Sequence, residues 1–311
     1  MGFAKLAERI LINMKKVFGF ILFVVICLCG CASEQGNNDE KINICATIFP
    51  QYDFARSIAG DLAQVSMLLP PGGESHTYEP TPKDIMTIHK SDIFIYTGGK
   101  SDNWIDEILK TIDTKDMKIL RLMDICGENS EQTHQHDVDE HVWTSPKNAV
   151  LICDAIFDAL VEIDKENEEI YTNRYMQYKN ELLALDTQFL RLVDNAKRKT
   201  VVFADRFPFS HFINDYGLDY YSPFTGCQEE SEASISSVAQ LIDKVKDEKI
   251  PVVFYIEFSN RTLADTVSEE TGAKPLLLHS CHSVSKEELE VGVTYIEIMK
   301  RNVQALREAL Y

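Results

Sequence analysis

Four histidines lie in three loops that are far apart in the sequence. His76 lies in the run PPGGESHTYEPTP, which follows an expected strand, and His141 lies in DVDEHVWTSP, which precedes an expected helix. His279 and His282 lie in LHSCH, just past another expected strand. Ligands gather beyond the carboxyl ends of strands in open α/β sheets, so the three loops could bring imidazoles to one point. Imidazoles, alone or with one carboxylate, suit Zn²⁺ or a similar ion better than Ca²⁺ or Mg²⁺.

The segments around these loops alternate between strand-like and helical patterns. Such alternation predicts parallel sheets covered by helices. The expected strands are 42–48, 65–69, 93–97, 200–204, 251–256 and 275–278. The expected helices include 51–59, 83–90, one that begins at Ser145-Pro146, one capped by Ser259 and ended by Gly272, and 294–310.

One helix in the middle of the chain is expected to be unusually long, from Lys165 to about Lys197. Its apolar residues recur at spacings of four and three, which predicts a single buried stripe. A helix of this length could run along two lobes and tie them together. The stripe consists of Tyr171, Tyr175, Tyr178, Leu182, Leu185, Phe189 and Leu192.

The N-terminal residues are typical of an export signal. Lys15 and Lys16 precede an apolar run that ends in Leu28-Cys29-Gly30-Cys31. The run is too short to span a bilayer, which takes about 20 apolar residues, so we expect a cleaved signal peptide at 1–30 rather than an uncleaved anchor. The ending resembles a bacterial lipobox, which implies that Cys31 carries lipid and that polar residues 31–41 form a flexible tether.

Charge and cysteine content exclude some classes of function. The chain has a net charge of −18, and removing a signal with a net charge of +3 leaves −21, which argues against binding nucleic acid. The cysteines beyond Cys31 contain no CxxC pair, so a tetrathiolate zinc site is not expected. Cys227 and Cys281 could form a disulfide in an exported protein.

The sequence resembles the zinc- and manganese-binding family of ABC-transporter solute-binding lipoproteins. The resemblance is carried by PGGESHTYEPTP, DEHVWTSP and TGAKPLLLHS followed by YIEIMKRNVQAL, and it covers nearly the whole mature chain. It implies an α/β fold with two parallel-sheet lobes, 42–163 and 199–311, joined by a rigid linking helix at 164–198. The metal would lie in the cleft between the lobes, with His76 and His141 as ligands.

The resemblance leaves the other ligands open. It places Arg206 at the family's third ligand position, and a guanidinium has no lone pair to offer a metal. It places His279 at the fourth position and His282 at the alternative one, so this pair could supply two ligands. The expected site is therefore His76, His141, His279 and His282.

Other residues near these loops are weighed as further ligands or as partners of Arg206. His211 follows Arg206 by five residues, but it falls inside an expected helix. Arg206 would need a carboxylate partner if buried, and the candidates Glu232 and Glu257 could instead bind the metal themselves. His134 and His136 resemble a shortened histidine-rich loop, which favours either a solvent-exposed tract or weak metal collection.

These features together predict a metal carrier rather than an enzyme. We expect an extracytoplasmic, lipid-anchored and monomeric binding protein at the cell membrane, which captures Zn²⁺ and passes it to a permease and ATPase. Mn²⁺ is the alternative cargo. A zinc hydrolase is the rival class, but HExxH and Gly-x-Ser-x-Gly are absent from the sequence. An exported adhesin with an incidental metal is the third alternative.

Overall fold

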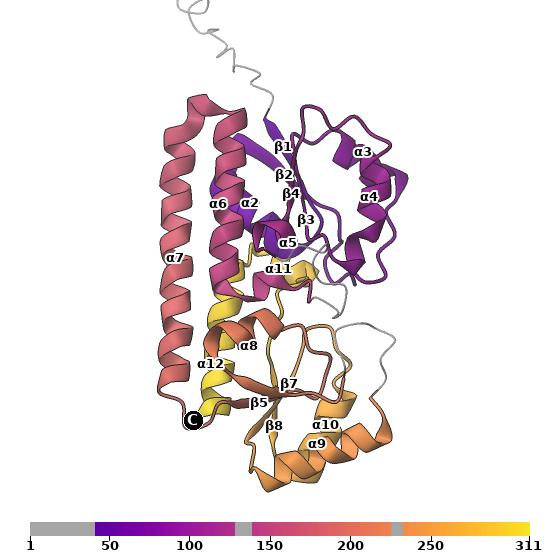
Figure 1. Cartoon of the computed structure of the whole chain (residues 1–311), viewed down its shortest axis with the longest axis vertical. Coiled ribbons are helices and arrows are strands. Elements are labelled where there is room, and N and C mark those ends of the chain that lie inside the picture. The colour runs from indigo at the N-terminus through magenta and orange to yellow at the C-terminus, as the bar shows by residue number, and fades with distance from the viewer. Residues whose placement is uncertain (1–40, 128–138, 225–232) are drawn as a thin grey trace, which may run out of the picture. The chain divides into compact units, whose positions relative to one another are not determined.

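The computed structural model describes residues 41–127, 139–224 and 233–311 (Figure 1). Some of the sequence-based predictions lie outside the described residues: the signal peptide, the tether, Cys31, His134, His136, Cys227 and Glu232. Residues Ile42–Tyr311 form one compact unit.

The first sheet has four parallel strands in the order β2-β1-β3-β4. Alternate residues along a strand point to opposite faces, and both faces of this sheet are buried. Ile44 and Ile95 face α2, α6 and α7, whereas Cys45 and Phe94 face α3 and α4. The strands are β1 (Ile42–Ala46), β2 (Ala63–Met67), β3 (Ile93–Tyr96) and β4 (Lys118–Arg121).

The second sheet is built from two parallel pairs, β5-β6 and β7-β8. A parallel bridge between Phe203 and Phe254 joins the two pairs. On one face Val202 and Val253 pack with residues of α9 and α10, and on the other Val201 and Phe254 join the main core. The strands are β5 (Thr200–Val202), β6 (Asp219–Tyr221), β7 (Val252–Tyr255) and β8 (Lys274–Leu277).

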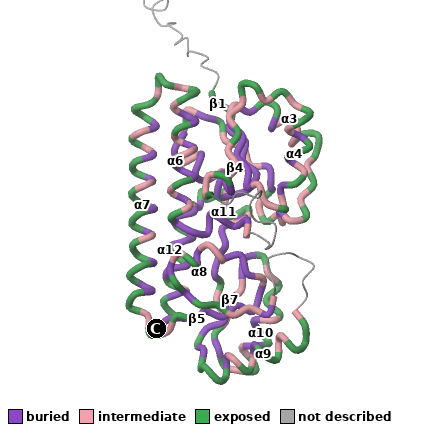
Figure 2. Tube along the Cα trace, in the orientation of Figure 1, coloured by how far each residue is buried: buried purple, intermediate pink, exposed green. Residues whose placement is uncertain are grey.

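The helix α7 (Glu168–Asp194) has 27 residues, follows a short 3-10 turn at Lys165–Asn167, and packs against α6 and α12 (Figure 1). Every apolar residue of its predicted stripe is buried, from Tyr171 to Leu192, while the other side faces solvent (Figure 2). The predicted α/β fold with parallel sheets and a long helix is therefore confirmed.

The remaining helices complete the layers around the two sheets. They are α2 (Phe49–Ala59), α3 (Pro82–His89), α4 (Asn103–Leu109), α5 (Leu122–Ile125), α6 (Pro146–Ile163), α8 (Ser210–Tyr216), α9 (Ile235–Asp247), α10 (Thr262–Thr271), α11 (Lys286–Glu290) and α12 (Tyr295–Leu310). Short 3-10 turns lie at Gly60–Leu62, Lys100–Asp102 and Val142–Thr144.

The predicted capping residues agree with the structure at the start of α6 and the end of α10, and differ at the start of α10. Ser145 caps α6 by accepting hydrogen bonds from the backbone of Lys147 and Asn148, as the Ser-Pro pair indicates. Ser259 was expected to cap α10, and this is wrong, because the helix begins at Thr262 after Arg261 with a φ of 59°. Gly272 ends that helix with a φ of 78°, as predicted.

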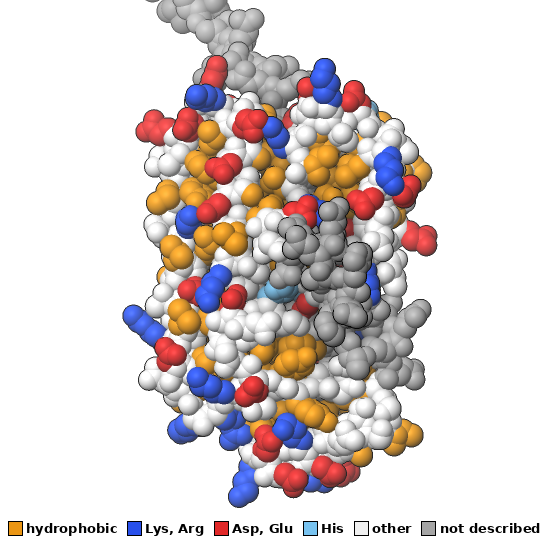
Figure 3. Space-filling model, viewed as in Figure 1, with side chains coloured by type: hydrophobic (Ala, Val, Ile, Leu, Met, Phe, Trp, Pro, Cys, Tyr) orange, Lys and Arg blue, Asp and Glu red, His pale blue; other side chains and the backbone are white. Residues whose placement is uncertain are grey.

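Among the described residues, no helix is both long enough and apolar enough to cross a membrane. Acidic and basic side chains are interspersed over the face drawn in Figure 3, although the chain as a whole carries a net charge of −18.

Candidate metal centre

Three histidines from the predicted loops meet at one point. One ring nitrogen each from His76, His141 and His282 lies within 4.8 Å of the other two. The ring centroids are 5.6 Å apart for His76 and His141, and 5.5 Å apart for each pair that includes His282. His141 is only 2% exposed, and the His76 side chain is 12% exposed. The loops that follow β2 and β8 and the loop before α6 therefore converge as the parallel-sheet argument predicts.

The ring of His76 is oriented by groups on its Nδ1 atom. The Ser101 hydroxyl lies 2.7 Å from Nδ1, and a Glu140 carboxylate oxygen lies 3.2 Å from it. Glu140 also accepts hydrogen bonds from the backbone and hydroxyl of Ser101. Burial alone would raise the pKa of Glu140, but the hydrogen bonds from His76 and Ser101 outweigh it and hold the pKa at about 2. This ionised carboxylate favours a proton on Nδ1 of His76, which leaves the Nε2 lone pair for a metal.

A second carboxylate orients His141 in the same way. Nδ1 of His141 donates to Asp139 across 2.6 Å, and its backbone N–H donates to the same oxygen across 3.0 Å. The other Asp139 oxygen accepts from the backbone of Ser210 across 3.1 Å. Burial would raise the pKa of Asp139, but the His141 contacts lower it well below its ordinary range. Because a carboxylate can only accept, His141 also presents an Nε2 lone pair.

His282 is held by its backbone and by its Nε2 atom. Nε2 contacts the Ser75 hydroxyl, so Nδ1 is the ring nitrogen left for a metal. The His282 backbone N–H donates to Glu257 across 3.2 Å, and Cys281 before it has a φ of 63°. This left-handed turn reverses the loop and directs the imidazole toward the other two histidines. Desolvation and the neighbouring rings of His141 and His76 lower the pKa of His282 well below its ordinary value, which keeps it neutral.

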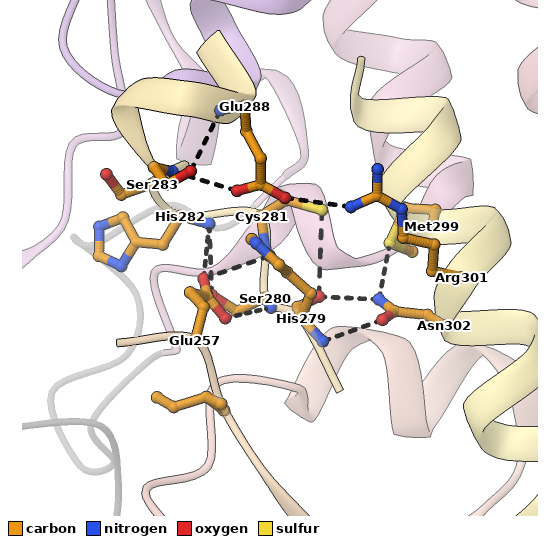
Figure 4. Close-up of polar contacts among 12 residues, drawn as sticks. Glu257, His279, Ser280, Cys281, His282, Ser283, Glu288, Met299, Arg301 and Asn302 are labelled. Carbon is orange, nitrogen blue, oxygen red and sulfur yellow. Dashed lines mark hydrogen bonds and ion pairs between the residues drawn. The ribbon is translucent and has the colours of Figure 1, made fainter. Parts of the chain in front are cut away.

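The structure does not bring His279 into this group. Its Nδ1 accepts a hydrogen bond of 2.9 Å from the Cys281 backbone and lies 3.5 Å from Glu257. Its backbone is held on both sides by the Asn302 amide at 2.9 and 2.7 Å. In Figure 4 the His279 ring lies inside this network, whereas the His282 ring points away from it. His279 thus occupies a position that supports the loop, and His282, expected at the alternative position, is the histidine that meets His76 and His141.

Glu257 stabilises the same loop rather than reaching the histidine group. Its two oxygens accept from the backbone and hydroxyl of Ser280 and from the backbone of His282. The residue is 9% exposed, and these donors satisfy a carboxylate that would otherwise be costly to bury. Among the described residues, the carboxylate that Arg206 contacts is Glu74, to which its Nη1 donates across 3.2 Å; the other expected candidate, Glu232, lies outside the described residues. The expected pairing with Glu257 is therefore wrong, because Glu257 is engaged by the loop.

His211 also lies outside the histidine group. Its Nε2 donates to the backbone carbonyl of Asp139 across 2.7 Å, so it supports the loop that carries His141. Cys281 has a free thiol that is fully buried, so it takes no part in the disulfide that the sequence allowed. Burial raises the pKa of the Cys281 thiol well above its ordinary value, so it stays protonated.

Trp143 is a site residue that was not predicted from the sequence. Its ring centroid lies 5.2 Å from that of His141 and 5.4 Å from that of His282. The indole Nε1 donates to the Ser280 carbonyl across 2.9 Å, and the Trp143 carbonyl accepts from the Tyr295 hydroxyl across 2.8 Å. Trp143 therefore joins the loop before α6 to the loop after β8. Its position two residues after His141 was the available signal, but an aromatic residue there is equally typical of a core.

Comparison with known proteins shows the family of the chain. The profile of the family described as zinc-uptake complex component A, periplasmic (ZnuA), matches residues 44–309. The chain belongs to this family. The predicted resemblance to metal-specific solute-binding proteins is thereby confirmed.

Two curated relatives in the ZnuA family illustrate the extent of the match. The high-affinity zinc uptake system protein ZnuA of Bacillus subtilis is 31% identical over 93% of this chain and 94% of its own length. The zinc-binding lipoprotein AdcA of Streptococcus pneumoniae serotype 4 is 32% identical over 92% of this chain. The chain spans 58% of the length of that relative.

Solved structures of the ZnuA type have the same fold. The Zn(II)-bound ZnuA-like domain of Streptococcus pneumoniae AdcA superposes with a TM-score of 0.74 at 30% identity, covering 87% of this chain and 99% of the domain. The metal-dependent lipoprotein YcdH of Bacillus subtilis gives a TM-score of 0.77 at 29% identity over 87% of this chain and all of YcdH.

Proposed function

We propose that this chain is the substrate-binding protein of a metal ABC transporter, which captures Zn²⁺ outside the cytoplasmic membrane and delivers it to the permease. The observation that carries the proposal is the convergence of His76, His141 and His282, whose ring nitrogens lie within 4.8 Å of one another. Borderline-soft imidazole ligands suit zinc, whereas manganese prefers more carboxylate and water. The zinc named in the AdcA and ZnuA relatives supports the same cargo.

The residues around the histidines support capture without rearrangement of the rings. Asp139 and Glu140 fix the nitrogens of His141 and His76 that face away from the cargo, and such outer contacts raise imidazole basicity. Desolvation keeps His282 neutral, so a cation meets a lone pair there rather than a proton. These features favour binding, and no catalytic role is proposed for them.

A titration of purified, chelator-stripped protein with Zn²⁺ against a competing chelator tests the proposal. We expect one ion per chain, and we expect His76→Ala, His141→Ala and His282→Ala each to weaken binding by at least the 10–100-fold typical of an outer-contact loss. His89→Ala, at an exposed position at the end of α3, is the matched control and should bind like the unaltered protein. Zinc affinity that survives all three site substitutions would refute the proposal.

A parallel titration with Mn²⁺ separates the two cargoes. Zinc is the stronger binder at a generic nitrogen site, so the informative quantity is the metal that the protein carries when purified from its own host. Zinc in that preparation supports the proposal, and manganese supports the alternative. Zinc-dependent hydrolysis of esters, peptides or phosphates by the loaded protein would instead favour the hydrolase reading.

We further propose that Cys31 anchors the protein by lipid to the extracytoplasmic face of the membrane, as a monomer that docks on the permease and its ATPase. Metabolic labelling with a radioactive fatty acid should mark the unaltered chain and fail to mark Cys31→Ser. Cys29→Ser, two residues away within the expected signal, is the control and should label normally. Labelling that persists in Cys31→Ser would contradict the anchor.

A further inference from the structure

Glu74 lies between the histidine group and the only permanent cation that lines the adjoining cavity in the described part of the chain. One of its oxygens, Oε1, lies 4.0 Å from Nε2 of His76, and the other, Oε2, accepts from Arg206 across 3.2 Å. The Glu74 side chain is 29% exposed and that of Arg206 is 20% exposed. The carboxylate therefore has one oxygen toward a candidate ligand and the other toward a guanidinium.

Glu74 and Arg206 both line a cavity of about 220 Å³ beside the histidine group. His76 and His282 line the cavity, together with Glu74, Arg206 and Glu257. A side chain that swings within this cavity can reach an ion held by the imidazoles without moving the backbone. Such a movement is required, because Glu74 lies outside the group of nitrogens within 4.8 Å of one another.

The charges around the group favour Glu74 over the other described carboxylates nearby. Three neutral imidazoles leave both charges of Zn²⁺ uncompensated, and zinc sites are almost always four-coordinate. Asp139 and Glu140 are bound to the far nitrogens of the imidazoles, and Glu257 is bound by the Ser280–His282 backbone. Glu74 is held less firmly, by the ion pair of Oε2 with Arg206 and by one hydrogen bond of 3.3 Å that Oε1 accepts from the His76 backbone N–H.

We propose, on the basis of the function proposed above, that Glu74 is the fourth ligand to the captured ion and that Arg206 is its counter-cation. A carboxylate can bind the ion through Oε1 while Oε2 keeps its hydrogen bond to Arg206. Arg206 has no lone pair and cannot itself bind a metal. The fixed positive charge of Arg206 draws electron density from Glu74 and repels the bound dication. Arg206 therefore lowers the affinity of the site for Zn²⁺ and eases release of the ion.

Zinc competition titrations of Glu74→Gln and Arg206→Met test this assignment. Glu74→Gln should weaken zinc binding by more than the roughly 100-fold upper range for an outer contact, and Glu79→Gln, in the same loop and exposed, should not change it. Arg206→Met should tighten binding by about tenfold or more, because a nearby positive charge is removed. In the Glu74→Gln background the Arg206→Met gain should shrink, since Arg206 acts partly through Glu74.

The visible absorption spectrum of the Co²⁺-loaded protein gives a readout that does not depend on affinity. The spectrum reports the number and type of ligands, so it should change in Glu74→Gln and stay unchanged in Glu79→Gln. If the unaltered protein binds zinc while Glu74→Gln binds equally well with an unchanged spectrum, Glu74 is not a ligand, and this inference fails while the proposed function stands. If the unaltered protein binds no zinc, the proposed function itself fails.

Discussion

The indole Nε1 of Trp143 donates a hydrogen bond of 2.9 Å to the backbone carbonyl of Ser280. This bond joins the loop of His141 to the loop of His282, which come from segments more than a hundred residues apart. Tyr295 extends the link, because its hydroxyl donates to the Trp143 carbonyl and its backbone N–H donates to the buried Asp53 across 2.8 Å. Trp143 thus ties the loops of two candidate ligands together through one side-chain hydrogen bond and one backbone hydrogen bond.

Replacing this tryptophan should loosen the histidine group. Trp143→Phe keeps an aromatic ring between His141 and His282 but leaves the Ser280 carbonyl without its donor, which should cost about 1–3 kcal/mol of unfolding free energy. Zinc affinity should fall by about tenfold, because the loops are no longer tied. Urea unfolding and zinc titration measure the two effects. Trp104→Phe, at the only other tryptophan, is the control, and equal zinc affinity in both variants would contradict the link.

A second prediction concerns Gly99, which packs against the carboxylate that orients His76. Gly99 has a φ of −88°, so alanine is compatible with its backbone, but an added Cβ would overlap both Cβ and Oε2 of Glu140. Gly99→Ala should therefore displace Glu140 and weaken zinc binding by about 10–100-fold, as loss of an outer contact does. Zinc titration measures this. Alanine at exposed Ser236, a neutral position on α9, should leave binding unchanged, and normal binding in Gly99→Ala would show that Glu140 is not needed.

The motif histidines could be predicted from sequence because their loops follow from the strand–helix alternation. His76 lies in the loop that follows β2 and His141 in the loop that precedes the well-capped α6, so parallel-sheet geometry brings both to the same region. The buried stripe of α7 could also be predicted, because apolar residues that recur with a period of 3.6 residues lie on one face of a helix. In each case the sequence pattern that supports the prediction lies within one short stretch of the chain.

The choice between His279 and His282 could not be made in the same way. Both follow β8 within five residues, and the difference depends on the left-handed turn at Cys281, where φ is 63°. A non-glycine residue rarely adopts this conformation, so no local pattern predicts it. The pairing of Arg206 with Glu74 joins residues 132 positions apart, and only the folded chain decides which acid reaches the guanidinium.

The bond between Asp139 and His141 gives a third prediction. Asp139→Asn keeps the shape of the side chain but removes its charge, so the amide can donate to Nδ1 and favour the wrong tautomer of His141. Zinc affinity should fall by about 10–100-fold. The unfolding temperature of the metal-free protein should also fall, because the ionised carboxylate accepts hydrogen bonds from His141 and Ser210 and its pKa is lowered in the folded protein. Asp116→Asn, at an exposed position, is the matched control. Unchanged zinc affinity in Asp139→Asn would mean that His141 needs no carboxylate to hold its orientation.

Glu140 should make the metal-free protein sensitive to acid. Hydrogen bonds from His76 and Ser101 overcome the burial penalty and lower the pKa of Glu140 from its ordinary 4.5 to about 2. A carboxyl whose pKa is lower in the folded protein than in the unfolded chain stabilises the fold above the unfolded pKa. That stabilisation, roughly 3 kcal/mol, is lost as the pH falls from 4.5 toward 2. Glu140→Gln should therefore reduce the unfolding free energy at pH 7. It should also make the unfolding free energy decline less steeply as the pH falls from 4.5 toward 2, which urea unfolding at a series of pH values measures. Glu181→Gln, on the exposed side of α7, should reproduce the unaltered curve, and an equally steep decline in Glu140→Gln would assign the acid sensitivity to other groups.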